Sequence, residues 1–472
     1  MSVVVPERAR LVERNAMERA LDRASGGRAI PGNAIRHLTD GPDTFAAMRE
    51  IIRAARNWIH FENYIINNDA TGRGFAELLA EAAGRGVAVR VLYDYFGCRG
   101  TSSSFWKSLR DKGVEVRCFN PVSILRPIES IERNHRKYVS ADGAAAIVGG
   151  LCIGDEWQGD PARKRRPWRD TAVLVRGPAV PALELSFAHT WGLAGEALPE
   201  LEPSNREEAG AAIIRVVEGI PASLRVYRTI QLMATGAAER LWITDAYLLP
   251  PQPMMAALIA AARDGLDIRL LVPGRTDIPV IAALSRVGYR ELLEAGVRIW
   301  EWRGPMLHAK TVIVDSTFFK VGSSNLNASS LRSNYELDLL IEDERVTGDA
   351  IQQFRADLSR SVEVVLRRPR WAMGKLADRV PPVARAAVGP GLTDHEPSTE
   401  ERSRRAVVNL RQVASGARRS IAGATVFALV GGGILFLAIP KIMATILAVA
   451  CFWLGGTAAW HFHQRRRLTA DE

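Results

Sequence analysis

The chain has 472 residues, of which 47% are hydrophobic, so it can form two or three domains with buried cores and is neither a disordered chain nor a disulfide scaffold. Its formal net charge of +10 favours an anionic partner, either nucleic acid or the surface of an anionic bilayer. The four cysteines form no Cys-x-x-Cys pair, which indicates a reducing compartment and no zinc site: Cys98, Cys118, Cys152 and Cys451.

The N-terminal segment, residues 1–36, is predicted to be an arm. Charged residues interrupt every apolar run before position 19, so we expect no signal peptide. Its apolar residues fit a short amphipathic helix: Leu11, Ala16, Met17, Ala20 and Leu21. We expect this helix to pack on the neighbouring domain, with contact to a membrane as the alternative.

Helices and strands then alternate through a first half, residues 37–205, and a second half, residues 206–371. The first half is predicted to begin with helices over 44–57 and 72–84 and strands over 58–66 and 88–95. Parts of this sequence return in the second half: 241–247 resembles 57–64, 258–271 resembles 79–92, and 293–299 resembles 109–116. This alternation predicts α/β halves, each with a mixed or mostly parallel sheet covered on both faces.

Each half contains one copy of a spaced set of His, Lys, Asp and Gly. The first copy reads His-Arg-Lys-Tyr-Val-Ser-Ala-Asp and the second His-Ala-Lys-Thr-Val-Ile-Val-Asp. In both copies the Lys follows the His by two positions, the Asp by seven and the Gly by fourteen. The matching positions are His135, Lys137, Asp142 and Gly149 in the first copy and His308, Lys310, Asp315 and Gly322 in the second.

This spacing indicates phosphate chemistry. Side chains alternate along a strand, so the His and the Lys of one copy point the same way. The ammonium neutralises an anionic phosphate, while the imidazole attacks phosphorus or protonates a leaving alkoxide near neutral pH. Ser323 and Asn325, which follow the second copy, add a hydroxyl and an amide donor. One copy alone could be an ordinary strand with a polar face, but the duplication favours a site with a nucleophile and an acid.

The two copies resemble the HKD motifs of the phospholipase D superfamily, and the first, which ends Gly-Gly-Leu-Cys-Ile-Gly-Asp-Glu-Trp, is most similar to bacterial cardiolipin synthases. The resemblance covers residues 37–371. It implies two α/β sandwich halves that are related by a pseudo-twofold axis and share one active site. One His would become a phosphohistidine and the other would handle the proton. We predict His135 as the nucleophile and His308 as the acid/base, with the exchanged roles as the alternative, since the sequence does not fix which His does which.

The resemblance also implies roles for other residues. A downstream acid in each half would orient the imidazole of that half, at Asp170 and Glu336, and the motif residues Asp142 and Asp315 would be structural. Lys137, Lys310, Asn325 and Ser323 would bind the phosphoryl oxygens. No carboxylate or Cys/His cluster with metal spacing accompanies the motifs, so we expect neither a metal nor another cofactor.

The first copy departs from this pattern at two positions. Cys152 stands where the second copy has Asn325, and Gly150 stands where it has Ser323. A thiol is a poor substitute for an amide in holding phosphate, so the first half-site could be weakened or retuned. His37, His60, His189 and His395 lie outside the repeat and are interpreted as core or surface histidines.

Two basic runs that contain tryptophan lie near the ends of the halves, at 163–169 and 367–371. Each is either a solvated loop or a patch that faces anionic lipid headgroups. Asp170 follows the first run directly, which places that run at the edge of the predicted site.

The C-terminal part is predicted to be a basic linker, residues 372–419, and a transmembrane hairpin, residues 420–462. Between Ile421 and Trp460 the only charged residue is Lys441, beside Pro440, which suits two spans. Arginines precede and follow the hairpin, so both of its ends and the catalytic halves are predicted to be cytoplasmic. A re-entrant hairpin or a buried helical pair is the alternative. Cardiolipin synthases usually carry anchors before the catalytic halves, so this order is a departure.

The resemblance therefore implies a phosphatidyltransferase of the cell membrane that joins two phosphatidylglycerols, releases glycerol and meets an anionic phospholipid membrane, with no nucleic acid as partner. Water as acceptor would make the same site a hydrolytic phospholipase D, and a nucleotide diester would make it a nuclease. The predicted hairpin argues against a soluble nuclease. A catalytically silent lipid-binding scaffold is suggested by Cys152 alone, and the intact second motif argues against it.

Overall fold

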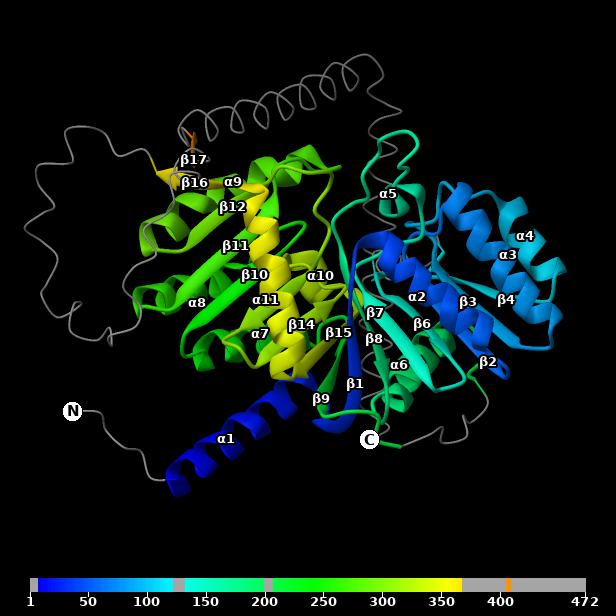
Figure 1. Ribbon diagram of the computed structural model, residues 1–472, viewed down its shortest axis with the longest axis horizontal. Coiled ribbons are helices and arrows are strands. Elements are labelled where there is room, and N and C mark those ends of the chain that lie inside the picture. Colours follow the sequence, from blue (N-terminus) through cyan, green and yellow to red (C-terminus); the bar gives the residue numbers. More distant parts are fainter. Residues whose placement is uncertain (1–6, 122–131, 199–206, 367–404, 409–472) are drawn as a thin grey trace, which may run out of the picture. The chain divides into compact units, whose positions relative to one another are not determined.

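The computed structural model describes residues 7–121, 132–198, 207–366 and 405–408 (Figure 1). The predicted hairpin 420–462, the basic run 367–371 and His395 lie outside these ranges. Within the described ranges, no helix is both long enough and apolar enough to cross a bilayer.

The first half is a mixed sheet with the strand order β4-β3-β2-β6-β7-β8-β1. Its pairs β2–β3 and β3–β4 are parallel and the others antiparallel. The strands are β1 (Ile30–Thr39), β2 (Trp58–Asn63), β3 (Ala88–Asp94), β4 (Glu115–Phe119), β6 (Lys137–Ala141), β7 (Ala145–Gly149) and β8 (Thr171–Arg176). The helices are α2 (Asp40–Ala54), α3 (Ala70–Gly84), α4 (Ser103–Asp111), α5 (Asp155–Gln158) and α6 (Val180–Leu193).

The second half repeats this sheet in the order β12-β11-β10-β13-β14-β15-β9. Its strands are β9 (Ala212–Gly219), β10 (Arg240–Thr244), β11 (Asp267–Pro273), β12 (Arg298–Trp302), β13 (Thr311–Val314), β14 (Phe318–Gly322) and β15 (Asn334–Glu342). Its helices are α7 (Arg225–Gly236), α8 (Gln252–Arg263), α9 (Pro279–Ala295), α10 (Ala328–Arg332) and α11 (Glu344–Ser359). The prediction of two repeated α/β halves with mixed sheets is therefore confirmed.

The elements predicted early in the first half are all present, although β2 ends three residues before the predicted boundary at Ile66. The second sheet also extends beyond the repeat. β16 (Ser361–Leu366) pairs with β12 in the antiparallel sense, and β17 (Arg405–Val408), inside the predicted linker, pairs in parallel with β16.

The two sheets are joined through β1 and a shared core. Residues 34–39 of β1 pair with β8 of the first half, whereas Ile30 and Asn33 pair with β9 of the second. Apolar side chains from both sheets and from α6 and α11 form one cluster between the halves, including Val173, Phe187 and Leu339. The halves are therefore packed against each other as one body.

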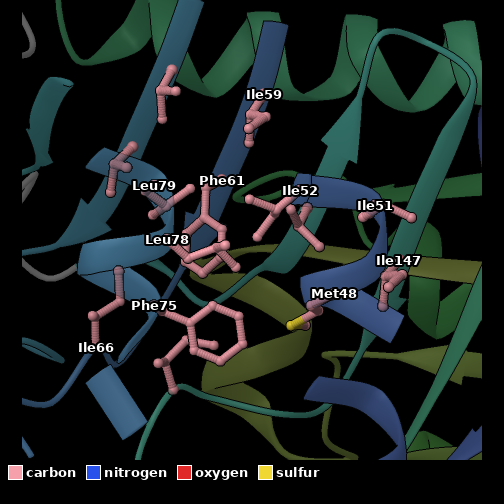
Figure 2. Packing of buried hydrophobic residues seen from close by; sticks show 14 of the residues in the cluster. Met48, Ile51, Ile52, Ile59, Phe61, Ile66, Phe75, Leu78, Leu79 and Ile147 are labelled. Atoms are coloured by element: carbon pink, nitrogen blue, oxygen red, sulfur yellow. The ribbon is translucent and has the colours of Figure 1, made fainter. Parts of the chain in front are cut away.

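Separate apolar clusters lie beneath the helices of each half. In the first half, α2 and α3 pack on β2 and β3, where Phe75 of α3 meets Phe61 of β2 at 6.0 Å between ring centroids (Figure 2). α3 begins after Asp69, whose carboxylate accepts the main-chain N–H of Gly72 at 2.8 Å as an N-cap. In the second half, α7, α8 and α9 cover the corresponding face.

The N-terminal arm contains α1 (Glu7–Ser25), which packs on α7 and β9. Leu21 enters the apolar cluster of the second half, and the buried Arg215 forms ion pairs with Glu18 and Asp22. The expectation that this helix packs on a neighbouring domain is confirmed, and the domain is the second half.

The motif residues Asp142 and Asp315 occupy equivalent turns, after β6 and after β13. Asp142 has φ +54° and accepts the main-chain N–H groups of residues 56, 57 and 58 at 2.7–2.8 Å. Asp315 has φ +51° and accepts those of residues 238, 239 and 240 at 2.8–3.0 Å. The two carboxylates thus hold the starts of β2 and β10, which is the kind of structural role that the resemblance implies.

We expect Asp142→Ala to destabilise the fold by about 2 kcal/mol, because three main-chain donors lose a charged acceptor. Asp142→Asn should cost less, since asparagine tolerates positive φ and keeps one acceptor oxygen. Denaturant unfolding of both variants provides the measurement. An alanine variant as stable as the parent would show that Asp142 does not stabilise the fold.

Candidate active site

Both motif histidines are anchored to the opposite half by the main chain. β5 (Arg133–Asn134) pairs in parallel with the start of β15, and the N–H of His135 donates to the carbonyl of Tyr335 at 2.9 Å. In the same way, the N–H of His308 donates to the carbonyl of Arg169 at 2.7 Å. Each histidine therefore lies beside the residue that precedes the acid of the other half.

The histidine–carboxylate pairs cross between the halves. His135 Nδ1 lies 2.9 Å from Glu336 Oε2, and His308 Nδ1 lies 2.7 Å from Asp170 Oδ2. The expectation that each acid orients the histidine of its own half is wrong. The main-chain pairing just described is the reason, since it carries each acid to the opposite imidazole. In each pair the carboxylate faces Nδ1, which leaves Nε2 available for chemistry.

The motif lysines lie directly beside the histidines. Lys137 Nζ donates to the carbonyl of His135, and Lys310 Nζ donates to the carbonyl of His308. Both lysines are only 1% exposed. Their buried ammonium groups form a cationic centre between the two halves, suited to an anionic phosphate.

Burial and these charges set the state of the titratable groups. Burial, followed by the charge of Lys310, lowers the pKa of His308 to about 4, although Asp170 opposes the shift. Burial also lowers the pKa of His135, where Glu336 opposes the shift and both lysines add to it. Because Lys310 acts on His135 and Lys137 acts on His308, the two motifs form one electrostatic unit.

The two carboxylates remain ionised in spite of burial. Burial acts to raise the pKa of Glu336, but His135, Lys137 and the Ser323 hydroxyl outweigh it and hold the pKa at about 2. His308 and Lys310 likewise lower the pKa of Asp170 against the effect of burial. Each carboxylate can therefore stabilise an imidazolium that forms beside it. In the described ranges, no group of three or more His, Cys, Asp or Glu residues is arranged to hold a metal ion.

Two motif copies, crossed carboxylates and paired lysines thus form a single site. The family described as Cardiolipin synthase, PLD-like domain, matches residues 48–155 and 230–358. Cardiolipin synthase A of Pseudomonas aeruginosa (strain LESB58) is 36% identical over 348 residues, which are 73% of this chain and 71% of that protein. The chain belongs to the phospholipase D-like cardiolipin synthase family.

Further relatives agree with this assignment. The cardiolipin synthase of Halalkalibacterium halodurans is 36% identical over 338 residues, 69% of this chain and 66% of that protein. The fold resembles the crystal structure of phosphatidylserine synthase from Haemophilus influenzae Rd KW20, with a TM-score of 0.59, 15% identity and coverage of 74% of this chain and 92% of that chain. The resemblance seen in the sequence is confirmed, and the chain is a phospholipase D-type phosphatidyltransferase.

The shells around the two carboxylates of this phospholipase D-like site differ. Glu336 accepts the hydroxyl of Ser323 at 2.6 Å, the hydroxyl of Ser330 and the amide of Asn334 at 3.3 Å. Asp170 instead accepts the indole N–H of Trp157 at 3.1 Å. Hydroxyl groups therefore hold the longer side chain of Glu336, whereas an indole N–H holds the shorter side chain of Asp170.

Gly150 explains this difference. A Cβ at position 150 would lie 2.2 Å from Asp170 Oδ1, so only glycine leaves room for the carboxylate. The serine of the second half, Ser323, would not fit at this position, and Trp157 supplies the donor in its place. The departure at Gly150 therefore fits the way Asp170 is held.

The remaining predicted residues differ in how free they are to meet a phosphate. The Ser323 hydroxyl donates to Glu336 and accepts the N–H of Leu337 at 2.9 Å, so its bonding capacity is directed away from a ligand. The Asn325 side-chain oxygen is buried without a partner among the described residues, but it is an acceptor, so a phosphoryl oxygen would have to be met by the amide NH2 of Asn325. Cys152 is 1% exposed, and burial raises the pKa of its thiol although Lys137 opposes the shift.

Aromatic side chains near the motifs were not predicted as site residues. The Tyr64 ring lies 4.8 Å from that of His135, and the Tyr247 ring lies 6.1 Å from that of His308. Trp157 and Trp168 lie 5.4 and 5.9 Å from the His308 ring. The alignment of 57–64 with 241–247 already paired the two tyrosines, so the repeat contained this signal.

The first basic run divides into exposed and buried parts. The side chains from Arg163 to Arg166 are exposed, whereas Arg169 is 6% exposed and forms an ion pair with Asp357 at 2.9 Å. The expectation that the whole run forms one patch is wrong for Arg169. That side chain crosses the interface between the halves, where a buried carboxylate neutralises it.

The histidines outside the repeat lie apart from the motif pairs. His60 is buried, pairs with Glu184 and stacks on Phe187 at 4.4 Å. His37 is half-buried and faces the ring of Phe319, whereas His189 is exposed and faces the ring of Tyr335. The interpretation of these three as core or surface residues agrees with their surroundings.

We expect activity to fall as the pH rises through about 8. Burial lowers the pKa of Lys310 to about 8, so its ammonium is charged below that pH and neutral above it. Loss of this charge weakens the hold on an anionic phosphate. In Lys310→Arg the alkaline limb of the pH profile of kcat/KM should disappear, even if the maximum is lower. An unchanged limb in that variant would assign the titration to another group.

Proposed function

We propose that this phosphatidyltransferase forms cardiolipin from two molecules of phosphatidylglycerol and releases glycerol. One observation carries the proposal: two Nδ1-bound histidines share one buried cationic centre, an arrangement that suits a nucleophile and a proton carrier for one phosphodiester. The similarity to cardiolipin synthases from two organisms supports this choice of substrate.

In the first step we assign the nucleophile to His135. Glu336 holds the proton on Nδ1, so the Nε2 lone pair attacks the phosphorus of the first lipid. The bond to glycerol breaks, and His308 gives its proton to the leaving alkoxide. A bound phosphodiester offsets the positive charge of Lys310 that depresses the pKa of His308, so substrate itself favours the protonated form.

In the second step the proton moves in the opposite direction. His308 accepts the proton from a glycerol hydroxyl of the second lipid, and that oxygen attacks the phosphorus. The bond between phosphorus and His135 breaks, which restores the free imidazole. Asp170 stabilises the imidazolium of His308 whenever it forms. We assign the contacts to the phosphoryl oxygens to Lys137, Lys310 and Asn325, and we reassign Ser323 to holding Glu336.

The setting of the reaction is also part of the proposal. A hairpin over 420–462 would keep the halves at the cytoplasmic surface of the cell membrane, where the anionic substrate is concentrated. Transfer to a lipid in place of water requires a site that positions the acceptor, and proximity can contribute roughly 7–11 kcal/mol to that step. The buried position of both histidines supports such an exclusion of water.

The purified full chain should convert phosphatidylglycerol alone, in bilayers or mixed micelles, into cardiolipin and free glycerol in equal amounts. Quantifying both products by mass spectrometry makes the test. Phosphatidic acid as the dominant product would replace the transferase with a hydrolytic phospholipase D. Cleavage of a nucleotide diester and of no lipid would overturn both lipid functions.

A further inference from the structure

Two exposed apolar segments occupy equivalent positions in the two halves. In the first half, Tyr95 and Phe96 follow β3 and are 41% and 48% exposed. In the second half, the exposed residues follow β11 and continue along α9: Ile278, Val280, Leu284 and Val287. Large apolar side chains left in water after corresponding strands of both halves indicate a surface that another body covers. We call these six residues the apolar edge.

The exposed face of α9 has the spacing of a docking helix. Val280, Leu284 and Val287 lie on one face, four and three positions apart, whereas Tyr289 and Leu292 are buried on the other. After this stripe the helix becomes charged, with an ion pair between Arg290 and Glu294. The unpartnered apolar surface is therefore limited to the part of α9 that follows the loop from β11.

Strand register places the apolar edge at the end of the sheets that carries the motifs. At the end of β2, Asn63 pairs with Tyr93 of β3 on one side and with Lys137 on the other. In the second half, Thr244 at the end of β10 likewise pairs with Leu271 and with Thr311, the residue after Lys310. The loops after β3 and β11 thus leave the sheets beside the two reactive histidines.

Hydrogen bonds tie both loops to the walls of the site. In the first half, Asp94 accepts the N–H of Phe96 at 2.8 Å and that of Asn134, the residue before His135, at 2.9 Å. In the same loop, Gly97 lies so close to the carbonyl of Tyr64 that a Cβ there would be 2.0 Å from its oxygen.

The second half makes the corresponding connection by a side chain. The hydroxyl of Tyr247 donates to Asp277, the residue before Ile278, at 2.8 Å. The Tyr247 ring in turn lies 6.1 Å from that of His308. A body that contacts the apolar edge therefore lies next to loops that are bonded to the immediate neighbours of the two histidines.

Positive charge accompanies the apolar edge and identifies the partner. Arg99 lies over the Phe96 ring at 4.4 Å, and Arg275 is exposed just before Ile278. A short hairpin, closed by the pairing of Asp160 with Arg165, exposes four successive cations from Arg163 to Arg166. It leads to Trp168, whose ring lies 5.9 Å from His308. In Figure 1 the α5 region and α9 lie in the upper part of the view, whereas α6 lies in the lower part.

We propose that the apolar edge inserts between the headgroups of an anionic bilayer and docks the active site directly on the membrane. Apolar side chains with flanking cations match a surface that is anionic outside and apolar beneath. Both halves contribute, so the contact is independent of any anchor at the C-terminus. The choice of phospholipid as substrate rests on the proposed function.

The first test compares substrates that differ only in whether a bilayer presents them. In the full chain, Val280→Asp with Leu284→Asp should slow consumption of vesicle-borne phosphatidylglycerol by about tenfold or more, since binding scales with buried apolar area. Consumption of a short-chain, monomeric phosphatidylglycerol should change by less than about twofold, because the chemistry is untouched. Equal losses on both substrates, or no loss on vesicles, would overturn the proposal.

A matched control is available on α6. Leu185 is 66% exposed, and its helix starts after the end of β8 that is remote from Asp170. Leu185→Asp should leave the vesicle rate within about twofold of the parent, because this residue is not part of the apolar edge. A loss equal to that of the α9 variant would mean that any new surface charge has this effect, and would overturn the assignment of the surface.

The second test identifies what covers the edge. A fluorophore is attached at Leu284→Cys, and separately at Leu185→Cys, with Cys118 and Cys451 changed to serine. Nitroxide groups on lipid acyl chains should quench the label at 284 and leave that at 185 bright. A label at 284 that the nitroxide lipids do not quench would mean that another part of this chain or a second copy covers α9. This result would overturn the proposal. If the parent consumes no phosphatidylglycerol, the proposed function fails and this quenching decides the inference alone.

Discussion

Replacing either motif histidine by alanine is expected to lower turnover by about 10⁴-fold or more, because each step needs both a nucleophile and a proton carrier. In the proposed mechanism, His135→Ala removes the attacking nitrogen, and His308→Ala removes the group that protonates the leaving glycerol. The measurement is single-turnover consumption of phosphatidylglycerol by the full chain. His60→Ala offers the control, since His60 is also buried but its imidazole is bonded to Glu184 and to neither motif histidine.

The same pair of variants distinguishes the roles of the histidines. His308→Ala should still form a phosphohistidine that is labile in acid, slowly and without onward transfer, whereas His135→Ala should form none. Acid quenching after exposure to phosphate-labelled lipid detects it. Labelling in His135→Ala and not in His308→Ala would exchange the two roles. Substantial turnover by either variant would remove the shared site.

Glu336→Gln is expected to lower kcat by about 10³-fold with little change in KM, because Glu336 is bonded to His135 Nδ1 and acts through that histidine in the proposed mechanism. The carboxylate accepts from His135 Nδ1, Ser323, Ser330 and Asn334, and its pKa of about 2 keeps it an acceptor at every working pH. An amide would turn N–H groups toward these donors and free the imidazole to rotate or change tautomer.

Ser330→Ala provides a graded comparison, because it removes one of these donors and leaves the carboxylate in place. We expect a loss of about tenfold or less in kcat, in line with one lost hydrogen bond. Steady-state kinetics on both variants, with unfolding curves to establish that they fold, makes the measurement. A Glu336→Gln enzyme with kcat within tenfold of the parent would show that His135 needs no orienting acid.

Many residues of the candidate site could be predicted from the sequence, because they belong to short motifs that occur twice. The identical spacing of His, Lys, Asp and Gly revealed both half-sites, since alternation along a strand is a property of a few neighbouring residues. The alternation of helical and strand segments in the first half likewise predicted α2, β2, α3 and β3. The motif positions of Asp142 and Asp315 were visible in the same spacing, but the main-chain N–H groups of residues 57 and 239 that they accept lie 85 and 76 positions away along the chain.

Other features depended on contacts that no local pattern encodes. The fit of Asp170 beside Gly150 and the substitution of Trp157 for a serine appear only when β8 and the loop after β7 lie side by side. The basic run 163–169 likewise looks uniform in the sequence. Only the structure shows that Arg169 is buried at the interface between the halves, while Arg163 to Arg166 are exposed. The apolar edge combines residues after β3 with residues of α9, which only the repeated sheets bring into equivalent positions.

The two half-sites, their phosphate chemistry and the family could be predicted along the chain, because these follow from residue types at short, repeated spacings. The pairing of each acid with its histidine depends on how the two halves pack. His308 and Asp170 are 138 positions apart, and His135 and Glu336 are 201 apart. Such pairs form when main-chain hydrogen bonds from His135 to Tyr335 and from His308 to Arg169 join the halves. The histidine–carboxylate pairs cross because of the way in which the two repeated sheets pack. The spacing of residues within either repeat carries no information about that packing.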